Sequence, residues 1–350
     1  MNLARALEDK GVQATVVRVA DGSPCTSPRV VGELDSGCAK SVAAGAELLN
    51  RSDAVIIQHA NGLFGGQDGA EVLDVIEALR VPLIVVIRTV QRTPSAHQRL
   101  VLDAIAARAD QLIATSRSAA EHLCSGYGVS SRAITVIPEG PTIPTGKAVV
   151  RRGRPTVLTC GLLRPGKGIE RVIEAMGSLH SLPGQPRYLI AGPTDPEELA
   201  AHGEAYRQSL KEQVRRMGLE GTVVFDERHR AGATLAELLQ TAAVVVLPYD
   251  STDQVCSGML IDAITAGRPT VSTAFPYAVE LMAQGAGTVV GHDDPEKLIS
   301  ALSQVLTQPR LAGTMAAEAR RLAQEMSWQV IAARYHTVVR SALAQRQRRS

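Results

Sequence analysis

Short runs of aliphatic and β-branched residues alternate with amphipathic patterns along the chain. In the first half the apolar runs are "VQATVVRV", "DAVIIQH", "PLIVVIRT", "QLIATS" and "AITVIP". Between them lie stretches such as "GAEVLDVIEALR" and "QRLVLDAIAARA", whose apolar positions recur at helical spacing. Largely apolar strands with helices between them are typical of a parallel sheet that is covered on both faces. The pattern therefore predicts an α/β fold.

The pattern stops once and then restarts. A proline- and glycine-rich basic segment, "PEGPTIPTGKAVVRRGRP", is followed by new apolar runs: "TVLTCG", "RYLIAG", "TVVFD", "VVVLPY", "PTVSTA" and "GTVVG". The chain has 350 residues, more than the ~250–300 at which a single core usually stops growing. We therefore predict two doubly wound halves, divided by a linker near residues 140–154.

Composition and charge narrow the class of protein. Hydrophobic residues make up 45% and charged residues 21% of the chain, and no apolar run approaches the ~18–20 residues that cross a bilayer. The net charge of +2 argues against broad nucleic-acid binding. The five cysteines are scattered, without a CxxC pair, and no histidine cluster has zinc-ligand spacing. The first residues also lack the pattern of a secretory signal. We expect a cytoplasmic protein without a metal; the sequence leaves the oligomeric state open.

The stretch "TCGLLRPGKGIERVIEAM", which begins at Thr159, joins an apolar run to a helical pattern. Arg164, Lys167 and Gly168 lie at the junction. A helix N-terminus offers unpaired N–H groups and a partial positive charge, glycine permits close approach, and the two basic side chains add full charges. These features predict a phosphate site, although an ordinary turn with solvated charges fits as well. The spacing matches neither a Walker loop nor a dinucleotide fingerprint.

A second stretch, "QVCSGMLIDAITAGRPTVSTA", also predicts an anion-binding helix N-terminus. Ser257 and Gly258 precede a helical pattern, so a second helix N-terminus is expected at the same sheet edge. Two such helix ends predict a diphosphate ligand. Asp262 is placed to accept hydrogen bonds from a ribose diol, but it is equally explained as a solvated acid on a helix. Gln254 is a candidate ligand of a sugar hydroxyl.

Five motifs together resemble a known family. "QHANGLFGGQDG", "GLLRPGKGIERVIEAM", "YLIAGPTDP", "GEAYRQSLKEQVRRMGL" and "PYDSTDQVCSGMLIDAITAGRPTVST" are similar to motifs of retaining, nucleotide-sugar-dependent glycosyltransferases of family 4, also described as glycosyl transferases group 1. The resemblance implies the GT-B fold, with two doubly wound, Rossmann-like domains facing across a cleft. It implies an acceptor-side domain over 1–148, a nucleotide-sugar-binding domain over 149–326, and a helix over 327–345 that crosses back and is anchored by Trp328.

The resemblance also assigns roles. It implies that Arg164 and Lys167 contact the donor diphosphate, and it places Arg88 with them as a catalytic residue. The other donor-binding residues are expected to be Gly161, Gly168, Thr194, Gln254, Ser257, Gly258, Met259, Leu260 and Asp262. The donor, a UDP- or GDP-linked sugar, is a substrate, and neither a cofactor nor a metal is expected.

Departures from the family pattern concern the first domain above all. Arg88 and Glu139 stand where members usually carry histidines, and Asp195 replaces a third in "TDP". Arginine lacks the neutral hydrogen-bonding form of imidazole. We predict that Arg88 and Glu139, from neighbouring strand ends, form a charge-assisted pair. The family's first strand and glycine-rich loop are not found after Met1, so the start is expected to be assigned too late or the copy to be decayed.

An acceptor site is expected near the first domain's "QHANGLFGG". His59 and Asn61 follow an apolar run there, and Glu139 is grouped with them, although a lone histidine is more often a satisfied core residue. The acceptor is expected to be a small molecule or a glycan. By contrast, "DERHR" is interpreted as a solvated loop and "GEAYRQSLKEQVRRMG" as an exposed helix, and neither is given a role.

These observations predict a glycosyltransferase that moves a sugar from a nucleoside diphosphate to an acceptor with retention of anomeric configuration. Positive charge and two helix N-termini would stabilise the leaving diphosphate. Two alternatives remain open: a catalytically degenerate relative that binds a sugar nucleotide, and a GT-B epimerase or phosphorylase.

Overall fold

A computed structural model describes residues 1–60, 62–144 and 153–348. The chain forms two compact units. Unit 1 comprises residues 1–140 and 327–350, and unit 2 comprises residues 141–326. Every strand pairing among the described residues is parallel. The predicted α/β class with parallel sheets is therefore confirmed.

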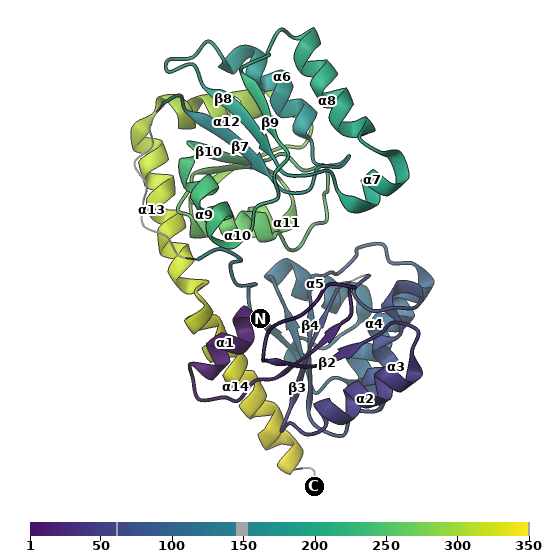
Figure 1. The fold of residues 1–350 in the computed structure, drawn as a ribbon. Helices are drawn as coiled ribbons and strands as arrows, with labels where there is room; N and C mark the ends of the chain where they lie inside the picture. Colours follow the sequence, from purple (N-terminus) through teal and green to yellow (C-terminus); the bar gives the residue numbers. More distant parts are fainter. Residues whose placement is uncertain (61, 145–152, 349–350) are drawn as a thin grey trace. The chain divides into compact units, whose positions relative to one another are not determined.

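Unit 1 contains a four-stranded sheet of order β3-β4-β5-β6 and a separate pair, β1-β2 (Figure 1). Its strands are β1 (Val16–Val19), β2 (Val30–Leu34), β3 (Val55–His59), β4 (Leu83–Ile87), β5 (Gln111–Ala114) and β6 (Ile134–Val136). Its helices are α1 (Asn2–Glu8), α2 (Ala39–Leu49), α3 (Val72–Glu77), α4 (Ala96–Arg108), α5 (Arg117–Tyr127) and α14 (Trp328–Gln347), with short 3-10 turns η1 (Gln67–Gly69) and η2 (Ser131–Ala133). All of the expected strands of this half are present, whereas β2 was not predicted.

The long helix α14 completes the core of unit 1. It packs beside α1 and over β4, as its buried side chains Ile331, Ala332 and Tyr335 share one apolar cluster with Ile84 and Val86 (Figure 1). Trp328 lies at the first residue of the helix, directly against Gly140, where any side chain would overlap the indole ring. The last segment of the chain is thereby fastened to the residue at which the chain leaves unit 1.

Unit 2 is built around a six-stranded sheet of order β12-β11-β10-β7-β8-β9. Its strands are β7 (Thr156–Cys160), β8 (Arg187–Ala191), β9 (Val223–Asp226), β10 (Val244–Leu247), β11 (Thr270–Thr273) and β12 (Gly287–Val290). Its helices are α6 (Ile169–Leu179), α7 (Pro196–His202), α8 (Ala205–Arg216), α9 (Gly232–Thr241), α10 (Gly258–Thr265), α11 (Pro276–Met282), α12 (Pro295–Thr307) and α13 (Pro309–Glu325).

The strand β10, inside the sheet of unit 2, is apolar at every position because both of its faces are buried. Val244 and Val246 belong to the core cluster on one side of the sheet, and Val245 and Leu247 belong to the cluster on the other. Successive side chains of a strand point to opposite faces, so a strand covered on both faces must be apolar at every position. This confirms the interpretation of the continuous apolar runs.

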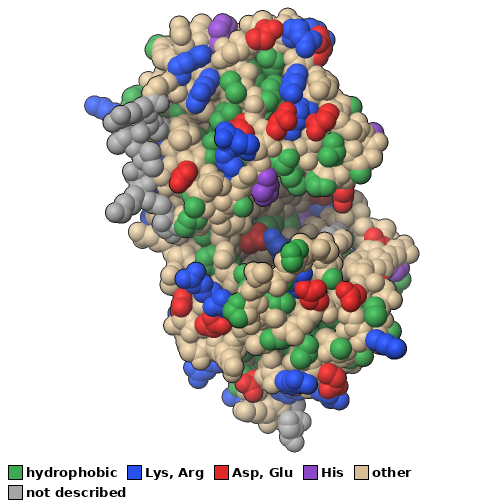
Figure 2. All heavy atoms as spheres, viewed as in Figure 1, with side chains coloured by type: hydrophobic (Ala, Val, Ile, Leu, Met, Phe, Trp, Pro, Cys, Tyr) green, Lys and Arg blue, Asp and Glu red, His purple; other side chains and the backbone are tan. Residues whose placement is uncertain are grey.

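The charged surface agrees with the small net charge. On the face shown in Figure 2, Lys and Arg side chains are interspersed with Asp and Glu and do not gather in one broad patch. Among the described residues no helix is long and apolar enough to cross a membrane.

Candidate active site

The two predicted phosphate loops of unit 2 follow neighbouring strands. β7 and β10 are adjacent in the sheet although β8 and β9 lie between them in the sequence. From β7 the chain proceeds outward to β8 and β9, and from β10 it proceeds in the other direction to β11 and β12. Such a switch in strand order is where open α/β sheets bind their ligands. The Asp250 N–H donates to the Gly166 carbonyl at 3.0 Å, so the two loops are also joined directly.

Gly168 shapes the start of helix α6. It is the N-cap residue, with φ of 62°, and a side chain at this position would overlap the carbonyl oxygen of Pro248. Because glycine has no side chain to cap the helix, the first N–H groups of α6 receive no side-chain acceptor from the described residues. Helix α10 differs, since the Ser257 hydroxyl accepts from the Leu260 N–H at 3.3 Å. The end of α6 therefore leaves more backbone N–H groups without an acceptor than the end of α10 does, which is the feature that anion sites at helix N-termini use.

A short parallel ladder holds the β7–α6 loop against the β8–α7 loop. The Leu163 N–H donates to Pro193, and the Asp195 N–H donates to Leu163, both at 2.9 Å. Gly192 permits this approach, because a side chain there would overlap the Gly161 carbonyl. The expected donor residue Gly161 has φ of 131°, a conformation that favours glycine, and a side chain there would meet open space.

Arg164 and Lys167 line one hollow of unit 2, together with Leu162, Asp195, Pro196 and Glu197. The Arg164 side chain is largely exposed, with Nε 4.0 Å from an Asp195 carboxylate oxygen. Lys167 is half-buried. Burial is the main cause that lowers the pKa of the Lys167 ammonium; nearby Arg164 lowers it further and Asp195 opposes the shift. The structure thus brings together the two basic residues that the sequence singled out.

The ring of Tyr249 packs against the ammonium of Lys167, and this contact was not identified from the sequence. The Lys167 Nζ lies 4.5 Å from the centre of the Tyr249 ring. That ring is buried against Phe275, with ring centres 5.5 Å apart, and burial raises the pKa of Tyr249 to about 12. A neutral aromatic face therefore holds the ammonium by a cation–π contact.

The polar residues predicted on the second loop are mostly engaged within unit 2. Asp262 is only 2% exposed, and its two carboxylate oxygens accept from the Thr142 N–H at 2.8 Å and the Thr142 hydroxyl at 2.5 Å. The alternative interpretation of Asp262 as a solvated helix acid is therefore wrong. The Gln254 side-chain amide donates to the Cys256 carbonyl at 2.9 Å. Ser257, Gly258, Met259 and Leu260 form the N-cap and first turn of α10.

Helix α8 contains a buried arginine, next to the expected donor ligand Thr194, that sequence reasoning missed. Arg207 is 2% exposed and donates to the Gly192 carbonyl at 2.9 Å and to the Thr194 hydroxyl at 3.2 Å. Thr194, an expected donor ligand, is itself buried and donates to a Glu204 carboxylate oxygen at 2.5 Å. The interpretation of α8 as an exposed helix is wrong for the face that carries Arg207, Leu210 and Val214. Their helical spacing was the signal available in the sequence.

In unit 1, Arg88 and Glu139 form the predicted ion pair. The pair follows β4 and β6, however, which are separated by β5. The expectation that they come from neighbouring strand ends is therefore wrong, and the reach of the arginine side chain accounts for the contact. This pair occupies the positions where the family resemblance implied histidines.

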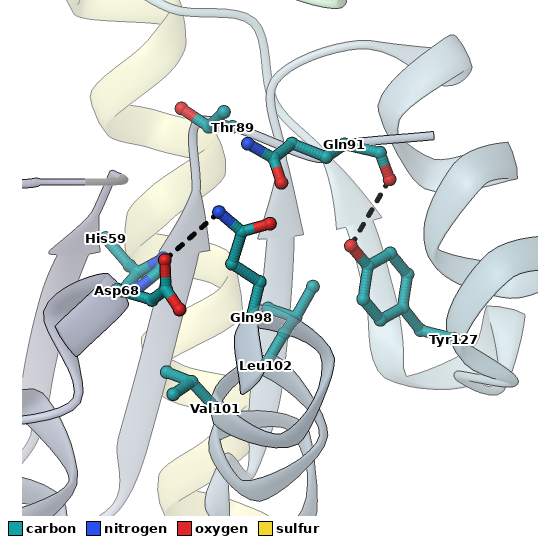
Figure 3. Close-up of a pocket in the computed structure, with 8 residues that line it drawn as sticks. All are labelled: His59, Asp68, Thr89, Gln91, Gln98, Val101, Leu102 and Tyr127. Carbon is teal, nitrogen blue, oxygen red and sulfur yellow. Dashed lines mark hydrogen bonds between the residues drawn. The ribbon is translucent and has the colours of Figure 1, made fainter. Parts of the chain in front are cut away.

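The remaining acceptor-side residue that the structure describes is His59, at the end of β3. It is 4% exposed and lies at a small pocket of unit 1 that also includes Asp68, Gln91 and Gln98 (Figure 3). Asn61 lies outside the described residues. Among those residues, no group of three or more His, Cys, Asp or Glu side chains is arranged to hold a metal ion.

Comparison with known sequence families identifies both halves of the chain. Residues 1–141 match the family described as Glycosyltransferase Family 4. Residues 154–308 match the family described as Glycosyl transferases group 1. No individual protein of curated function matches the sequence significantly.

Comparison with solved structures finds relatives in fold at low sequence identity. HepE of Anabaena, in complex with UDP and glucose, is 18% identical, with a TM-score of 0.76 over 97% of this chain and 94% of its own. Sucrose-phosphate synthase of Thermosynechococcus elongatus is 18% identical, with a TM-score of 0.74 over 98% and 92%. A glycosyltransferase of Rickettsia africae is 14% identical, with a TM-score of 0.74 over 98% and 93%. These likenesses confirm the GT-B fold.

Proposed function

The chain belongs to the group 1, family 4 glycosyltransferases, and from that membership we propose that it transfers a sugar from a UDP-linked donor to an acceptor hydroxyl, with retention at the anomeric carbon. The preference for UDP over GDP is supported by the fold relative HepE, whose structures contain UDP, UDP-glucose, or UDP with glucose. In the reaction the anomeric carbon leaves the diphosphate oxygen and joins the acceptor oxygen. The acceptor's proton ends on the released nucleoside diphosphate.

The observation that carries this proposal is the basic loop at the strand-order switch of unit 2. It combines the uncapped N-terminus of α6 with the basic side chains Arg164 and Lys167 and with the close approach that Gly168 permits. Backbone N–H groups, a helix dipole and two full positive charges are suited to a diphosphate.

The proposed catalytic lever is electrostatic. Negative charge grows on the diphosphate as the glycosidic bond breaks, so contacts from Arg164 and Lys167 strengthen in the transition state and accelerate bond cleavage. These two cations take the place of a divalent metal in neutralising the leaving group. We therefore expect a chelator to leave turnover unchanged. Because none of the five cysteines, all of them described, forms a disulfide, we further propose that the protein works in the reducing cytoplasm.

The test is a binding and turnover screen with UDP-, GDP- and TDP-sugars. Calorimetry should show tightest binding for a UDP-sugar, and NMR of the glycoside formed should show the donor's anomeric configuration. A glycoside of inverted configuration would contradict retention. Binding without turnover of any donor would favour a catalytically degenerate relative. The Arg88–Glu139 pair would then be interpreted as a sign of that degeneration. Turnover without an acceptor product, or only with a sugar phosphate, would indicate an epimerase or a phosphorylase.

A further inference from the structure

A polar pocket lies wholly within unit 1, at the carboxyl edge of its sheet. Its walls come from five separate segments: the end of β3, the turn η1, the chain that follows β4, helix α4 and helix α5 (Figure 3). The lining residues are His59, Asp68, Thr89, Gln91, Gln98, Val101, Leu102 and Tyr127. Six of these eight are polar, which is unusual for a cavity that serves only to close a hydrophobic core.

His59 is the lining residue that points most strongly to a ligand. It is 4% exposed, and neither ring nitrogen has a hydrogen-bond partner within the described part of the chain. Its ring stacks on Phe64, with centres 6.4 Å apart and planes 12° from parallel. Burying a polar group without a partner is costly, so a buried imidazole that has no partner among the described residues and lies beside a polar pocket is suited to receive a ligand group.

The side chains opposite His59 are already fixed in place. Asp68 has φ of 53°, a left-handed conformation that residues other than glycine seldom adopt. Its carboxylate is held by His97 at 2.9 Å and by the Gln98 amide at 3.1 Å. Gln98 is fixed in turn by a capping box with Ser95 at the start of α4. Unusual backbone geometry that is maintained by several contacts is a feature of functional sites.

The chemistry of the lining selects the ligand. Burial lowers the pKa of His59, so near neutral pH its ring has one nitrogen that donates and one that accepts. A hydroxyl group also donates and accepts, and therefore satisfies such a ring. The lining contains the Asp68 carboxylate and neither lysine nor arginine, so a phosphate or carboxylate would find no cationic side chain among the lining residues.

The size of the pocket limits what enters. The free space at its centre is about 20 Å³, which suits one group of the size of a water molecule or a hydroxyl. We infer that this pocket receives an uncharged, hydroxyl-bearing arm of the acceptor, such as the hydroxymethyl group of a hexose, and orients the acceptor through His59. This inference rests on the proposed glycosyl transfer. The alternative occupant of the pocket is a permanently bound structural water.

The first experiment measures ligand binding at the pocket in the absence of glycosyl transfer. The imidazole signals of His59 are followed by NMR while methyl glucoside, galactoside and mannoside are added, each with the donor absent. Methyl xyloside, which lacks the arm, and methyl glucuronide, which carries a carboxylate there, are the controls. We expect a saturable shift with at least one hexoside and none with the controls. Equal shifts with all probes, or none with any hexoside, would overturn the inference.

The second experiment separates acceptor binding from donor binding. We expect His59→Leu to raise the KM of the responding hexoside about tenfold to a hundredfold, as loss of one or two buried hydrogen bonds implies. The KM of the donor and the slow release of UDP to water should stay within about twofold. Gln91→Ala is a second lining variant should His59→Leu fold poorly. His202→Leu removes an exposed histidine of unit 2 and should change none of these quantities.

The outcomes distinguish the two proposals. An unchanged hexoside KM in both lining variants, with or without a lower melting temperature, identifies a structural water and overturns the inference. Absence of both donor binding and UDP release in the wild-type protein overturns the proposed function, while the NMR titration still decides what the pocket holds.

Discussion

Replacing Lys167 by alanine tests the proposed diphosphate site most directly. In the protein without donor, the substitution removes a cation–π contact with Tyr249, whose ring centre is 4.5 Å from Nζ, and such contacts are worth about 0.5–2 kcal/mol. It also removes a half-buried charge, whose burial lowers the pKa of this lysine. These two effects oppose one another. We therefore expect the free energy of unfolding to change by less than about 1 kcal/mol.

The effect on catalysis should be much larger. If the ammonium contacts the diphosphate more strongly as the glycosidic bond breaks, its removal costs about 2–4 kcal/mol of transition-state stabilisation. That corresponds to a loss of roughly 30- to 1000-fold in rate. Arg164→Ala should behave similarly. It removes a largely exposed side chain whose nearest carboxylate is Asp195, 4.0 Å away, so the folded state loses little.

The chain supplies a matched control in Lys211. Its Nζ also lies over an aromatic ring, 5.8 Å from the centre of Phe225, and it pairs with Glu227 at 3.3 Å. It belongs to the same unit but to helix α8, and it is not among the residues that line the hollow of Arg164 and Lys167. The assay measures kcat/KM for UDP release with acceptor present, alongside thermal unfolding. Lys211→Ala should stay within about twofold of wild type in rate. If Lys167→Ala keeps full activity with every accepted donor while Lys211→Ala loses it, the diphosphate site lies elsewhere.

Three further predictions concern the residues that support the sites. Gly168→Ala forces a left-handed conformation and an overlap with the Pro248 carbonyl, so urea titration should show a free energy of unfolding lower by at least about 1–3 kcal/mol; an unchanged value would mean that this turn is not closely packed. Thr142→Val removes the hydroxyl that donates to Asp262 and should cost about 1.5–3 kcal/mol in the same titration, whereas a neutral result would show that the carboxylate does not need this hydroxyl. Burial lowers the pKa of His59 from its ordinary 6.5, so below that pH the unfolded chain binds a proton that the folded chain does not, and stability declines as the pH falls. Chemical unfolding from pH 7.5 to 5 should show a shallower decline for His59→Asn, and parallel curves would count against a buried neutral imidazole.

Most of the strands were predictable because burial on two faces leaves a local signature. A strand such as β10, covered on both sides, must be apolar at every position, and such a run is visible without knowledge of its neighbours. The missed strand β2 has no such signature. Its sequence "VVGEL" includes a glycine and a charged residue, its burial alternates between half-buried and exposed until Leu34, and it pairs only with β1 among the described residues. An edge pair of this kind resembles a loop in sequence.

The candidate site residues that the sequence identified are those that directly follow a strand with a local apolar signature. Arg164, Lys167 and Gly168 were identified because polar and glycine residues directly after an apolar run mark the carboxyl end of a strand, and that edge is where parallel sheets bind ligands. The Arg88–Glu139 pair was predicted from opposite charges at one edge, although the strand between them was not foreseen. In each case the informative residues lie at strand ends, where local sequence and position in the sheet are directly linked.

The features that sequence reasoning missed depend on contacts between segments far apart in the chain. Asp262 meets Thr142 across 120 residues, and no local pattern distinguishes that buried carboxylate from a solvated one on the same helix. Arg207 shares a helical stripe with Leu210 and Val214, and a charged residue on an otherwise apolar stripe implies either an exposed stripe or a buried partner. In this chain the partners are backbone and side-chain oxygens of the loop that begins at Gly192. That loop is held against the loop that carries Lys167. An arginine that the sequence analysis placed on an exposed helix therefore supports a neighbour of the proposed diphosphate site. A charged residue on an apolar helical stripe is thus a position whose role the sequence alone does not decide.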